Sequence, residues 1–289
     1  MYARPDNPVV LLGDNLKVVP RRHPLQWIAA LLILLLLVQL VRISFDNPNF
    51  QWDVFGTYMF SPIIMDGLVL TLWLTVATMA MGTGLGIILA LMRISQSPFL
   101  AGAAGTFIWF FRGTPVLVQL MIWYNLAALF PTYEIGIPFG PSLFSGSVND
   151  LISPYTAALL GLGLNEAAYM AEIIRAGITS VHDGQQDAAK ALGMRRLQSM
   201  RRIVLPQAMR FIVPPTGNQT ISMLKTTSIV SVIALSDLTY SAQSIYSRTY
   251  ETIPLLLVAS FWYLATTSLL SILQGRIERR FQRQQGRKS

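Results

Sequence analysis

Cysteine is absent from this chain and histidine is scarce. Among 289 residues there are no cysteines and two histidines, so disulfides, thiol catalysis and cysteine-based metal sites are excluded. His23 lies in a polar N-terminal stretch and His182 in a loop, and neither has a second histidine three or four residues further on. A metal site built on a pair of histidines is therefore not expected.

Charged residues are also few. They make up 12% of the chain, against about 25% in soluble domains, whereas 53% of the residues are hydrophobic. Several apolar runs approach the ~20 residues that a helix needs to cross a bilayer, so we expect an all-α integral membrane protein. The net charge of +8 would suit a nucleic-acid-binding protein. In a membrane protein, basic cytoplasmic loops explain that charge, and no nucleic-acid partner is expected.

The first apolar run, residues 27–43, follows a polar arm at residues 1–26. The length of the arm and the lack of a small-residue cleavage site favour a retained membrane helix over a cleaved signal peptide. Residues 44–65 then form a connector, which we place in the periplasm. Beyond anchoring, the sequence predicts no function for the arm or for this first helix.

The second apolar run, residues 67–92, contains Gly82, Gly84 and Gly86. A nucleotide-binding loop is not favoured, because no strand precedes these glycines and the last glycine of the dinucleotide motif is missing. Gly82 and Gly86 are four residues apart, and this spacing predicts a face on which another transmembrane helix can pack closely.

The remaining runs complete a set of six expected spans. Residues 98–111 and 115–130 flank Arg112, which we place near the cytoplasmic surface because an arginine at the bilayer centre costs at least ~3 kcal/mol. Residues 98–111 are expected to lie along or just inside that surface, and residues 115–130 are expected to span the membrane. The sequence does not fix the residue at which this third span begins. The rest of the chain divides into a loop at 131–153, a span at 154–176, a span at 207–235 interrupted by Pro214–Pro215, a span at 254–275 and a basic tail at 276–289.

The positive charges give the orientation of these spans. If the N-terminus is cytoplasmic, 19 of the 22 Lys and Arg residues fall in the arm, the cytoplasmic loops or the tail. Only Arg42, Lys225 and Arg248 lie elsewhere. The opposite orientation would contradict the enrichment of Lys and Arg in cytoplasmic loops, so we expect both ends of the chain in the cytoplasm.

The cytoplasmic loop at residues 179–206 contains a basic, helix-like segment, DAAKALGMRRLQSMRRIVLP, at 187–206. Asp187 is expected in the first turn of a short helix, where an anion suits the helix dipole. Gly193 is expected to end that helix in a left-handed cap. Such a helix can lie in the groove of a partner protein, but composition alone equally allows a solvated loop held by lipid headgroups.

The spacing of this loop resembles the coupling motif of ABC importer permeases, which reads E-A-A, three residues, G, nine residues and I-x-L-P. Both gaps match, and Asp187 replaces the usual glutamate with a carboxylate that is one methylene shorter. The tripeptide EAA at 166–168 is a decoy, because it lies within a span and lacks the downstream positions. The resemblance implies these ATPase-coupling residues: Gly184, Asp187, Ala188, Ala189, Gly193, Ile203, Leu205 and Pro206.

Other stretches between about residues 66 and 281 are similar to the polar amino-acid branch of that family, whose members carry histidine, arginine, glutamine, glutamate or opines. They include FFRGTPVLVQL, AAYMAEIIRAGITSV and KTTSIVSVIALSDL. The resemblance implies the transmembrane fold of a type I ABC importer, with a transmembrane domain at 66–275 that has a five-helix core, preceded by an extra N-terminal helix. One departure is Thr226, where the family commonly has aspartate.

For function, the resemblance implies an importer subunit in the bacterial inner membrane. Two permeases, identical or homologous, pair in the membrane, and their coupling loops contact two cytoplasmic ATPases. A periplasmic or lipid-anchored binding protein delivers the amino acid. Because the chain has no G-x-x-x-x-G-K-[ST] motif, we expect a non-catalytic subunit without a cofactor of its own, with ATP and Mg²⁺ bound by the partner ATPase.

Polar residues within the expected spans are candidates for the substrate pathway. Glu166 lies near mid-membrane and must face protein or water, so it either meets a cationic group of the substrate or pairs with a neighbouring helix. Lys225 either attracts a substrate carboxylate or extends to the outer interface. Glu172 and Arg175 are three residues apart and predict a helical ion pair. The complete set of pathway candidates is Asn165, Glu166, Asn218, Gln219, Lys225, Thr226, Thr227 and Ser228.

Two other classes of function compete with an importer subunit. An intramembrane enzyme would need a nucleophile, a base or a metal within the spans, and the chain has no cysteine, no paired histidines and no G-x-S-x-G motif. The alternative that remains is a secondary amino-acid transporter or a channel that is not coupled to ATP. Such carriers often contain two inverted halves, and no repeat of that kind is visible in the sequence.

Overall fold

The computed structural model describes residues 24–136 and 142–283, and the chain divides into two compact units, 1–50 and 51–289. The first unit contains the long helix α1 (Pro24–Asp46) and the short 3-10 helix η1 (Pro48–Phe50). The large apolar side chains of α1 are more than half exposed within the chain, which suits a helix surrounded by lipid. The expected arm at 1–26 lies outside the described residues up to residue 23.

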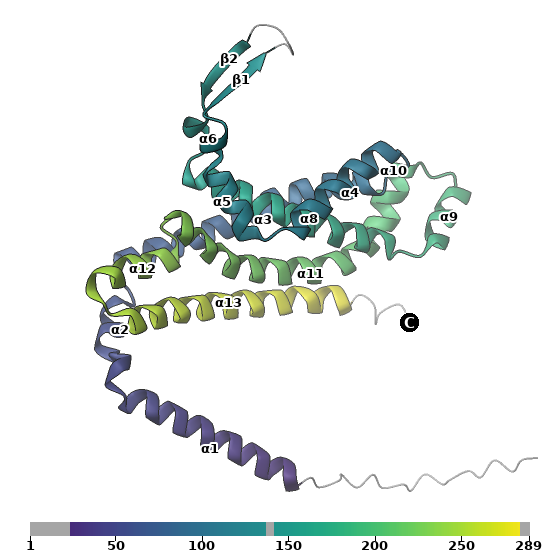
Figure 1. The fold of residues 1–289 in the computed structure, drawn as a ribbon. Coiled ribbons are helices and arrows are strands. Elements are labelled where there is room, and N and C mark those ends of the chain that lie inside the picture. The colour runs from purple at the N-terminus through teal and green to yellow at the C-terminus, as the bar shows by residue number, and fades with distance from the viewer. Residues whose placement is uncertain (1–23, 137–141, 284–289) are drawn as a thin grey trace, which may run out of the picture. The chain divides into compact units, whose positions relative to one another are not determined.

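The second unit consists of long helices joined by shorter elements, and one β-hairpin projects from them (Figure 1). Its elements are α2 (Trp52–Tyr58), α3 (Pro62–Arg93), α4 (Pro98–Gly113), α5 (Val116–Tyr124), α6 (Leu126–Leu129), β1 (Thr132–Gly136), β2 (Ser142–Ser147), α7 (Val148–Leu151), α8 (Pro154–Thr179), α9 (Asp183–Ala191), α10 (Arg196–Ser199), the π-helix η2 (Met200–Val204), α11 (Leu205–Thr226), the 3-10 helix η3 (Thr227–Ile233), α12 (Leu238–Thr249) and α13 (Thr252–Arg283).

Among the residues that the structure describes, four helices are individually long and apolar enough to cross a membrane: α1, α3, α8 and α13. Two bent pairs pass the same test, so the number of spans reaches six if each pair counts as one. These pairs are α4 with α5, bent by 100°, and the segment Arg196–Ile233 with α12, bent by 44°. The expected first, second, fourth and sixth spans therefore correspond to single helices. The third and fifth correspond to bent pairs.

The prediction that residues 115–130 form a spanning helix is wrong. α5 ends at Tyr124 and has 9 residues, which gives it a length of about 14 Å, whereas the hydrocarbon core is ~30 Å thick. α5 can contribute only part of a span, and it passes the test of length and apolar composition only together with α4, across a bend of 100°.

The predicted interruption at Pro214–Pro215 is also wrong. α11 continues through both prolines, and the chain departs from α-helix only at Thr227, where η3 begins. In this stretch the hydroxyl groups of Thr227, Ser228 and Ser231 each donate to the carbonyl three residues earlier. Ala234 then adopts φ 56°, which ends η3 before α12. α12 is an element that the apolar runs did not predict.

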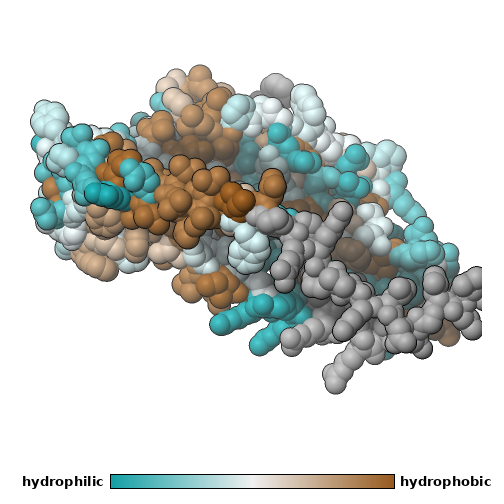
Figure 2. Space-filling model, turned by 90° about the horizontal axis from the view of Figure 1, so that it is seen from below, coloured by the Kyte–Doolittle hydropathy of each residue, from teal (hydrophilic) through white to brown (hydrophobic). Residues whose placement is uncertain are grey.

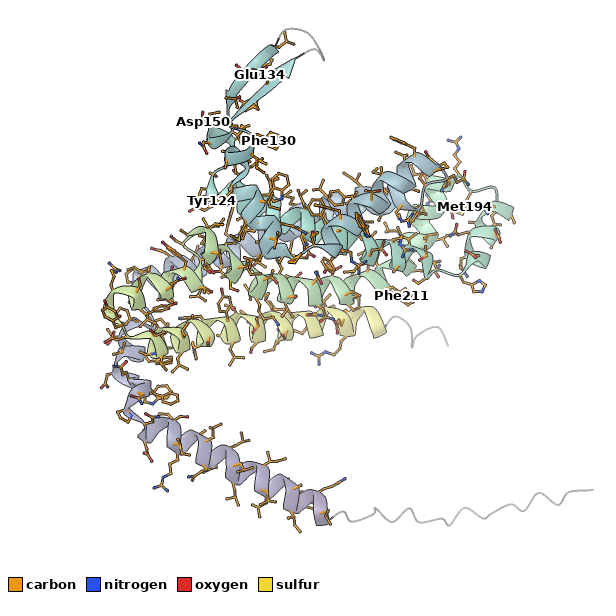
Figure 3. The ribbon with its side chains drawn as sticks, in the orientation of Figure 1. Tyr124, Phe130, Glu134, Asp150, Met194 and Phe211 are labelled. Atoms are coloured by element: carbon orange, nitrogen blue, oxygen red, sulfur yellow. The ribbon has the colours of Figure 1, made fainter. Side chains whose placement is uncertain are left out.

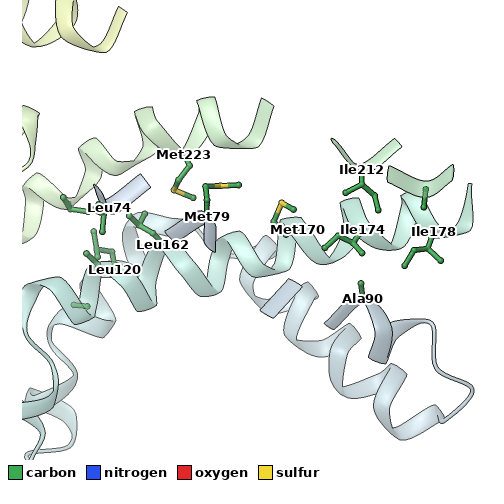
Figure 4. Packing of buried hydrophobic residues seen from close by; sticks show 14 of the residues in the cluster. Leu74, Met79, Ala90, Leu120, Leu162, Met170, Ile174, Ile178, Ile212 and Met223 are labelled. Carbon is green, nitrogen blue, oxygen red and sulfur yellow. The ribbon is translucent and has the colours of Figure 1, made fainter. Parts of the chain in front are cut away.

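Two clusters of buried side chains form the core of the second unit. In the larger cluster, residues of α3, α8 and α11 interdigitate (Figure 4). In the smaller one, the beginning of α3 packs with α12 and α13 through Ile64, Leu68, Leu238, Ala242, Leu255 and Val258. Other large apolar side chains of this unit remain exposed. Figure 2, which draws both units, shows broad hydrophobic areas of surface with hydrophilic residues beside them. Such apolar surface is expected where a protein meets lipid or another membrane subunit.

α3 and α8 form the most extensive helix–helix contact, and glycines bring them together. A Cβ atom at Gly82 would lie 2.6 Å from Cγ of Glu166, and one at Gly86 would lie 2.7 Å from Cβ of Met170. Gly84, on another face of α3, has no atom within 4 Å of such a position. The predicted close-packing face of Gly82 and Gly86 is confirmed.

The expected loop at 131–153 contains the antiparallel hairpin of β1 and β2, in which Thr132 pairs with Ser147. Figure 3 shows Phe130 and Asp150 near the base of this hairpin and Glu134 on its first strand. The turn, residues 137–141, lies outside the described residues. At the other end of the chain, the expected tail at 276–289 begins as helix, because α13 extends to Arg283.

The glycines of α3 allow a matched test of helix packing. Replacing Gly82 or Gly86 by alanine forces a Cβ atom against α8, and overpacking of this kind costs about 1–3 kcal/mol. We expect a lower thermal midpoint for the purified protein in lipid nanodiscs. Gly84→Ala, with open space around it, is the control and should leave the midpoint equal or higher, because alanine favours helix. Equal losses in all three variants would contradict glycine-mediated packing of α3 on α8.

Candidate functional site

The short helix α9 lies in the loop that connects α8 to α11. His182 caps its N-terminus, with Nδ1 accepting a hydrogen bond from the backbone N–H of Gly184 at 3.1 Å. Because α9 begins at Asp183, that residue occupies the first turn, and the prediction that Asp187 does so is wrong. Asp187 lies in the second turn and forms an exposed ion pair with Lys190 at 3.0 Å.

The predicted left-handed cap at Gly193 is confirmed. Gly193 has φ 69°, a conformation that other residues adopt only with strain. Its N–H donates to the carbonyl of Lys190 at 2.9 Å, and the N–H of Met194 donates to the carbonyl of Ala189 at 3.0 Å. These two bonds form a Schellman motif, which gives α9 a defined end and direction.

α9 packs on the segment that leads into α11. It contacts η2, and Ala189 is fully buried in this part of the chain. Gly184, Asp187 and Ala188 are exposed. The residues that resemble the end of the coupling motif lie where η2 becomes α11: Ile203 is half-buried, whereas Leu205 and Pro206 are exposed.

Two exposed leucines flank the turn at Gly193, and neither was among the expected ATPase-coupling residues. Leu192 is 80% exposed and Leu197 is 79% exposed. Figure 3 marks Met194 at this turn between α9 and α10. Leucines in an otherwise basic and polar loop were the signal that could have identified them. Apolar side chains that protrude from a polar loop suit contact with another protein.

Asn165 helps to close the break between α4 and α5. Its Nδ2 donates to the carbonyl of Phe111 at 2.7 Å and to Oε1 of Gln119 at 3.3 Å. Nε2 of Gln119 lies 3.0 Å from the same carbonyl and 2.6 Å from Oγ1 of Thr114. Carbonyls at a helix end need partners when they are buried, so Asn165 and Gln119 stabilise the bend. Sequence reasoning missed Gln119, because its partners lie in another helix.

Glu166 is 1% exposed and lies between α3 and α11. Its Oε2 accepts a hydrogen bond from Nε2 of Gln219 at 3.0 Å, and its methylene groups pack against Gly82. Its Oε1 has no hydrogen-bond partner in the part of the chain that the structure describes. Of the pathway candidates, the structure thus brings Glu166 and Gln219 together.

The other candidates on α11 and η3 bond mainly within their own stretch. Thr226 donates to Ser222, Thr227 to Leu224 and Ser228 to Lys225, in each case from the side-chain hydroxyl to a backbone carbonyl. Lys225 is exposed. Asn218 is the exception, because its Oδ1 accepts a hydrogen bond from Nε2 of Gln274 on α13 at 2.9 Å.

The predicted ion pair of Glu172 and Arg175 is confirmed, with Nη2 and Oε2 at 2.7 Å. Glu172 also lines a pocket of about 540 Å³ between α4, α8 and α11. Arg112, at the end of α4, lies on the wall of this pocket with its guanidinium carbon 5.2 Å from the centre of the Tyr169 ring. The pocket therefore contains side chains of both signs.

A buried aspartate holds the beginning of α12, and the sequence analysis missed it. Asp237 is fully buried and accepts hydrogen bonds from the N–H groups of Thr239 and Tyr240 and from the hydroxyl of Tyr263. The adjacent N–H of Leu238 donates to Oγ1 of Thr71 at 3.0 Å. Asp237 is therefore the N-cap through which α3, α12 and α13 are joined.

Comparison with known proteins adds a family and several relatives. A family model described as "Binding-protein-dependent transport system inner membrane component" matches residues 82–283. The arginine transport system permease protein ArgU of Corynebacterium glutamicum is 43% identical over 91% of this chain and 82% of its own length. The octopine permease OccM of Rhizobium meliloti is 38% identical over 80% of this chain and 89% of its own length. The glutamine permease GlnP of Escherichia coli is 33% identical over 80% of this chain and 98% of its own length.

Solved structures give the same result. A chain from a crystal structure of an amino acid ABC transporter with histidines is 38% identical, with a TM-score of 0.65, and the match covers 78% of this chain and 97% of that one. A chain of the MetNI methionine ABC transporter in an inward-facing conformation matches with a TM-score of 0.60 at 16% identity, covering 76% and 96%. At 16% identity, the match to the methionine transporter chain shows a shared fold alone.

The bend between α4 and α5 yields a further prediction. Gln119→Leu removes a donor to the carbonyls of Phe111 and Thr114 and the amide oxygen that accepts from Asn165. Asn165 still donates to the Phe111 carbonyl, so the loss falls on the partly buried polar groups of Thr114 and Asn165, and such groups left without partners cost about 1–3 kcal/mol. We expect a lower thermal midpoint in nanodiscs. Thr106→Ala, which removes an exposed hydroxyl bonded within α4, is the control and should change the midpoint little. A Gln119→Leu variant as stable as the control would contradict the role of Gln119 in stabilising the bend.

Proposed function

Since this chain belongs to the family of inner-membrane components of binding-protein-dependent transport systems, we propose that it is the permease subunit of an ATP-driven importer of polar amino acids. The observation that carries the proposal is 43% identity to an arginine permease across almost the whole chain. The names of other relatives extend the cargo to octopine and glutamine. We assign the transport domain to residues 66–275, which overlaps most of the family match. Family membership speaks against the alternative of a carrier or channel that works without ATP.

α9 is the contact with a separate cytoplasmic ATPase, which binds the ATP and Mg²⁺. Three features support this assignment. The Schellman cap at Gly193 gives the helix a defined end, Asp187 and Ala188 are exposed, and Leu192 and Leu197 provide apolar contact area beside them. A helix that is short, firmly capped and packed on the start of α11 can transmit displacement, whereas a solvated loop would absorb it.

The assembly contains two permeases, two ATPases and a binding protein that delivers the amino acid from outside. Because Lys and Arg concentrate in the loop around α9 and in the tail, both ends of the chain lie in the cytoplasm and the protein lies in the inner membrane. The hairpin of β1 and β2 is in the loop expected on the opposite side, where the binding protein docks. The permease itself is not catalytic.

Coupling through α9 can be tested at Gly193. A β-branched residue strongly disfavours φ 69°, so Gly193→Val should displace α9, whereas Gly193→Asn tolerates this conformation. In proteoliposomes that contain the permease, its ATPase and the binding protein, we expect valine to reduce uptake per ATP hydrolysed at least about tenfold. Asparagine should retain most of the uptake. Equal uptake per ATP in both variants would contradict coupling through α9.

Glu166 tests the proposed substrate pathway. Glu166→Gln keeps the shape that packs on Gly82 and a group that can bond Gln219, but removes the charge. If the buried carboxylate with its unpartnered Oε1 meets cationic cargo when the helices move, uptake of arginine should fall by about tenfold or more while the ATPase still assembles. Unchanged uptake and an unchanged substrate profile would show that Glu166 only pairs helices.

A further inference from the structure

The pocket between α4, α8 and α11 has a position and a size that suit a small ligand. Tyr169, Glu172 and Ile173 lie on one stripe of α8, and α11 contributes Phe211 and Pro215. Glu172 is seven residues before the end of α8 at Thr179, which places it roughly 10 Å inside that end. The volume of about 540 Å³ falls within the range of small-molecule sites.

Arg112 in this pocket lacks a counterion. No carboxylate lies within ion-pair distance of its guanidinium in the described ranges 24–136 and 142–283. The ring of Tyr169 supports the cation instead, which costs the guanidinium none of its hydrogen-bond donors. Glu172 lines the same pocket and is affected by the charge of Arg112, but Arg175 already donates to both of its oxygens. A guanidinium that is held in place with free donors is suited to a ligand carboxylate.

The same pocket has acceptors for a positive group. Glu172 remains 24% exposed at its side chain while it bonds Arg175, so its carboxylate can accept further hydrogen bonds. Pro215 has no N–H, and the carbonyl of Phe211, four residues earlier, therefore lacks its helical donor. A free amino acid presents a carboxylate and an ammonium group on one carbon, and the pocket offers a partner for each.

We propose that this pocket binds the backbone ends of the transported amino acid, with Arg112 holding the α-carboxylate and Glu172 the α-ammonium. The assignment rests on the proposed import of amino acids and adds the place and chemistry of recognition. Ile173 and Phe211 face the remaining space, where side chains of different polar amino acids fit. Arg112 and Glu172 were not among the pathway residues expected from the sequence, because the pocket forms only when α4 bends towards α8.

The proposal is tested by measuring the binding of free ligands to the permease–ATPase complex in nanodiscs. The binding protein is left out, so that the permease alone determines which ligand binds. The probes are L-arginine and L-glutamine, each compared with its decarboxylated form, agmatine and 4-aminobutanamide. In the wild type, each amino acid should bind at least about tenfold more tightly than its decarboxylated form, because a charge-assisted hydrogen bond contributes that much. Arg112→Gln should bring both ratios close to one and leave the affinity for agmatine nearly unchanged.

Arg93→Gln is the matched control. Arg93 also acts electrostatically on Glu172 but does not line the pocket, and its guanidinium donates to the carbonyl of Ala101. The Arg93→Gln variant should bind each amino acid more tightly than its decarboxylated form by the same ratio as the wild type. Equal loss of both ratios in the two variants would overturn the proposal in favour of a general effect of positive charge, and unchanged ratios in Arg112→Gln would assign Arg112 to lipid or to a second permease. Failure of the wild type to bind either amino acid would overturn it as well.

These outcomes are distinguishable from failure of the proposed function. If the pocket assignment is wrong but the importer assignment is right, reconstituted uptake driven by ATP and the binding protein still occurs. In that case, the preference for each amino acid over its decarboxylated form does not depend on Arg112. If the chain is not such a permease, reconstituted uptake is absent in the wild type, whatever the ratios show.

Discussion

The close contact of α3 with α8 is the constraint on which the rest of the second unit depends. Glycines at positions 82 and 86 let the two backbones approach, so Glu166 and Met170 lie directly against α3. Lipid tails are as apolar as the side chains of the helices, so the hydrophobic effect does not drive helices together within a membrane. Close packing at small residues stabilises the contact instead. Because this contact fixes the rotation of α8, it also fixes which stripe of α8 faces α4 and which faces α11.

Bends in the other helices are stable because polar side chains at or beside each bend take over the hydrogen bonds that the bends release. Gln119 and Asn165 do so at the break between α4 and α5, and Asp237 does so at the start of α12. In a membrane no water replaces a missing partner, so irregular backbone persists only where protein supplies one. Both bent pairs are anchored to neighbouring helices, α4 with α5 to α8 through Asn165, and the start of α12 to α3 and α13 through Thr71 and Tyr263.

This difference explains what the sequence could predict. The cap at Gly193, the ion pair of Glu172 with Arg175 and the packing of Gly82 follow from spacing along one helix, and they were correct. At the 100° bend, Gln119 meets the carbonyl of Phe111, and α11, which continues through Pro214, packs against α8. The spacing of apolar residues along a single helix carries no information about such contacts between helices. The pocket of Arg112 was missed for the same reason, since it requires the bend.

In the proposed importer, the coupling helix and the pocket are linked by short, continuous structure. Three residues separate the end of α8 from the start of α9, and α9 packs on η2, which continues directly into α11. Displacement of α9 by an ATPase therefore reaches both α8 and α11, which carry Glu172 and Phe211. Because dense cores shift between discrete arrangements and do not deform gradually, a movement of α8 relative to α11 changes the pocket itself. Recognition of cargo and the response to ATP thus act on the same pair of helices, which gives the permease a direct way to release its ligand.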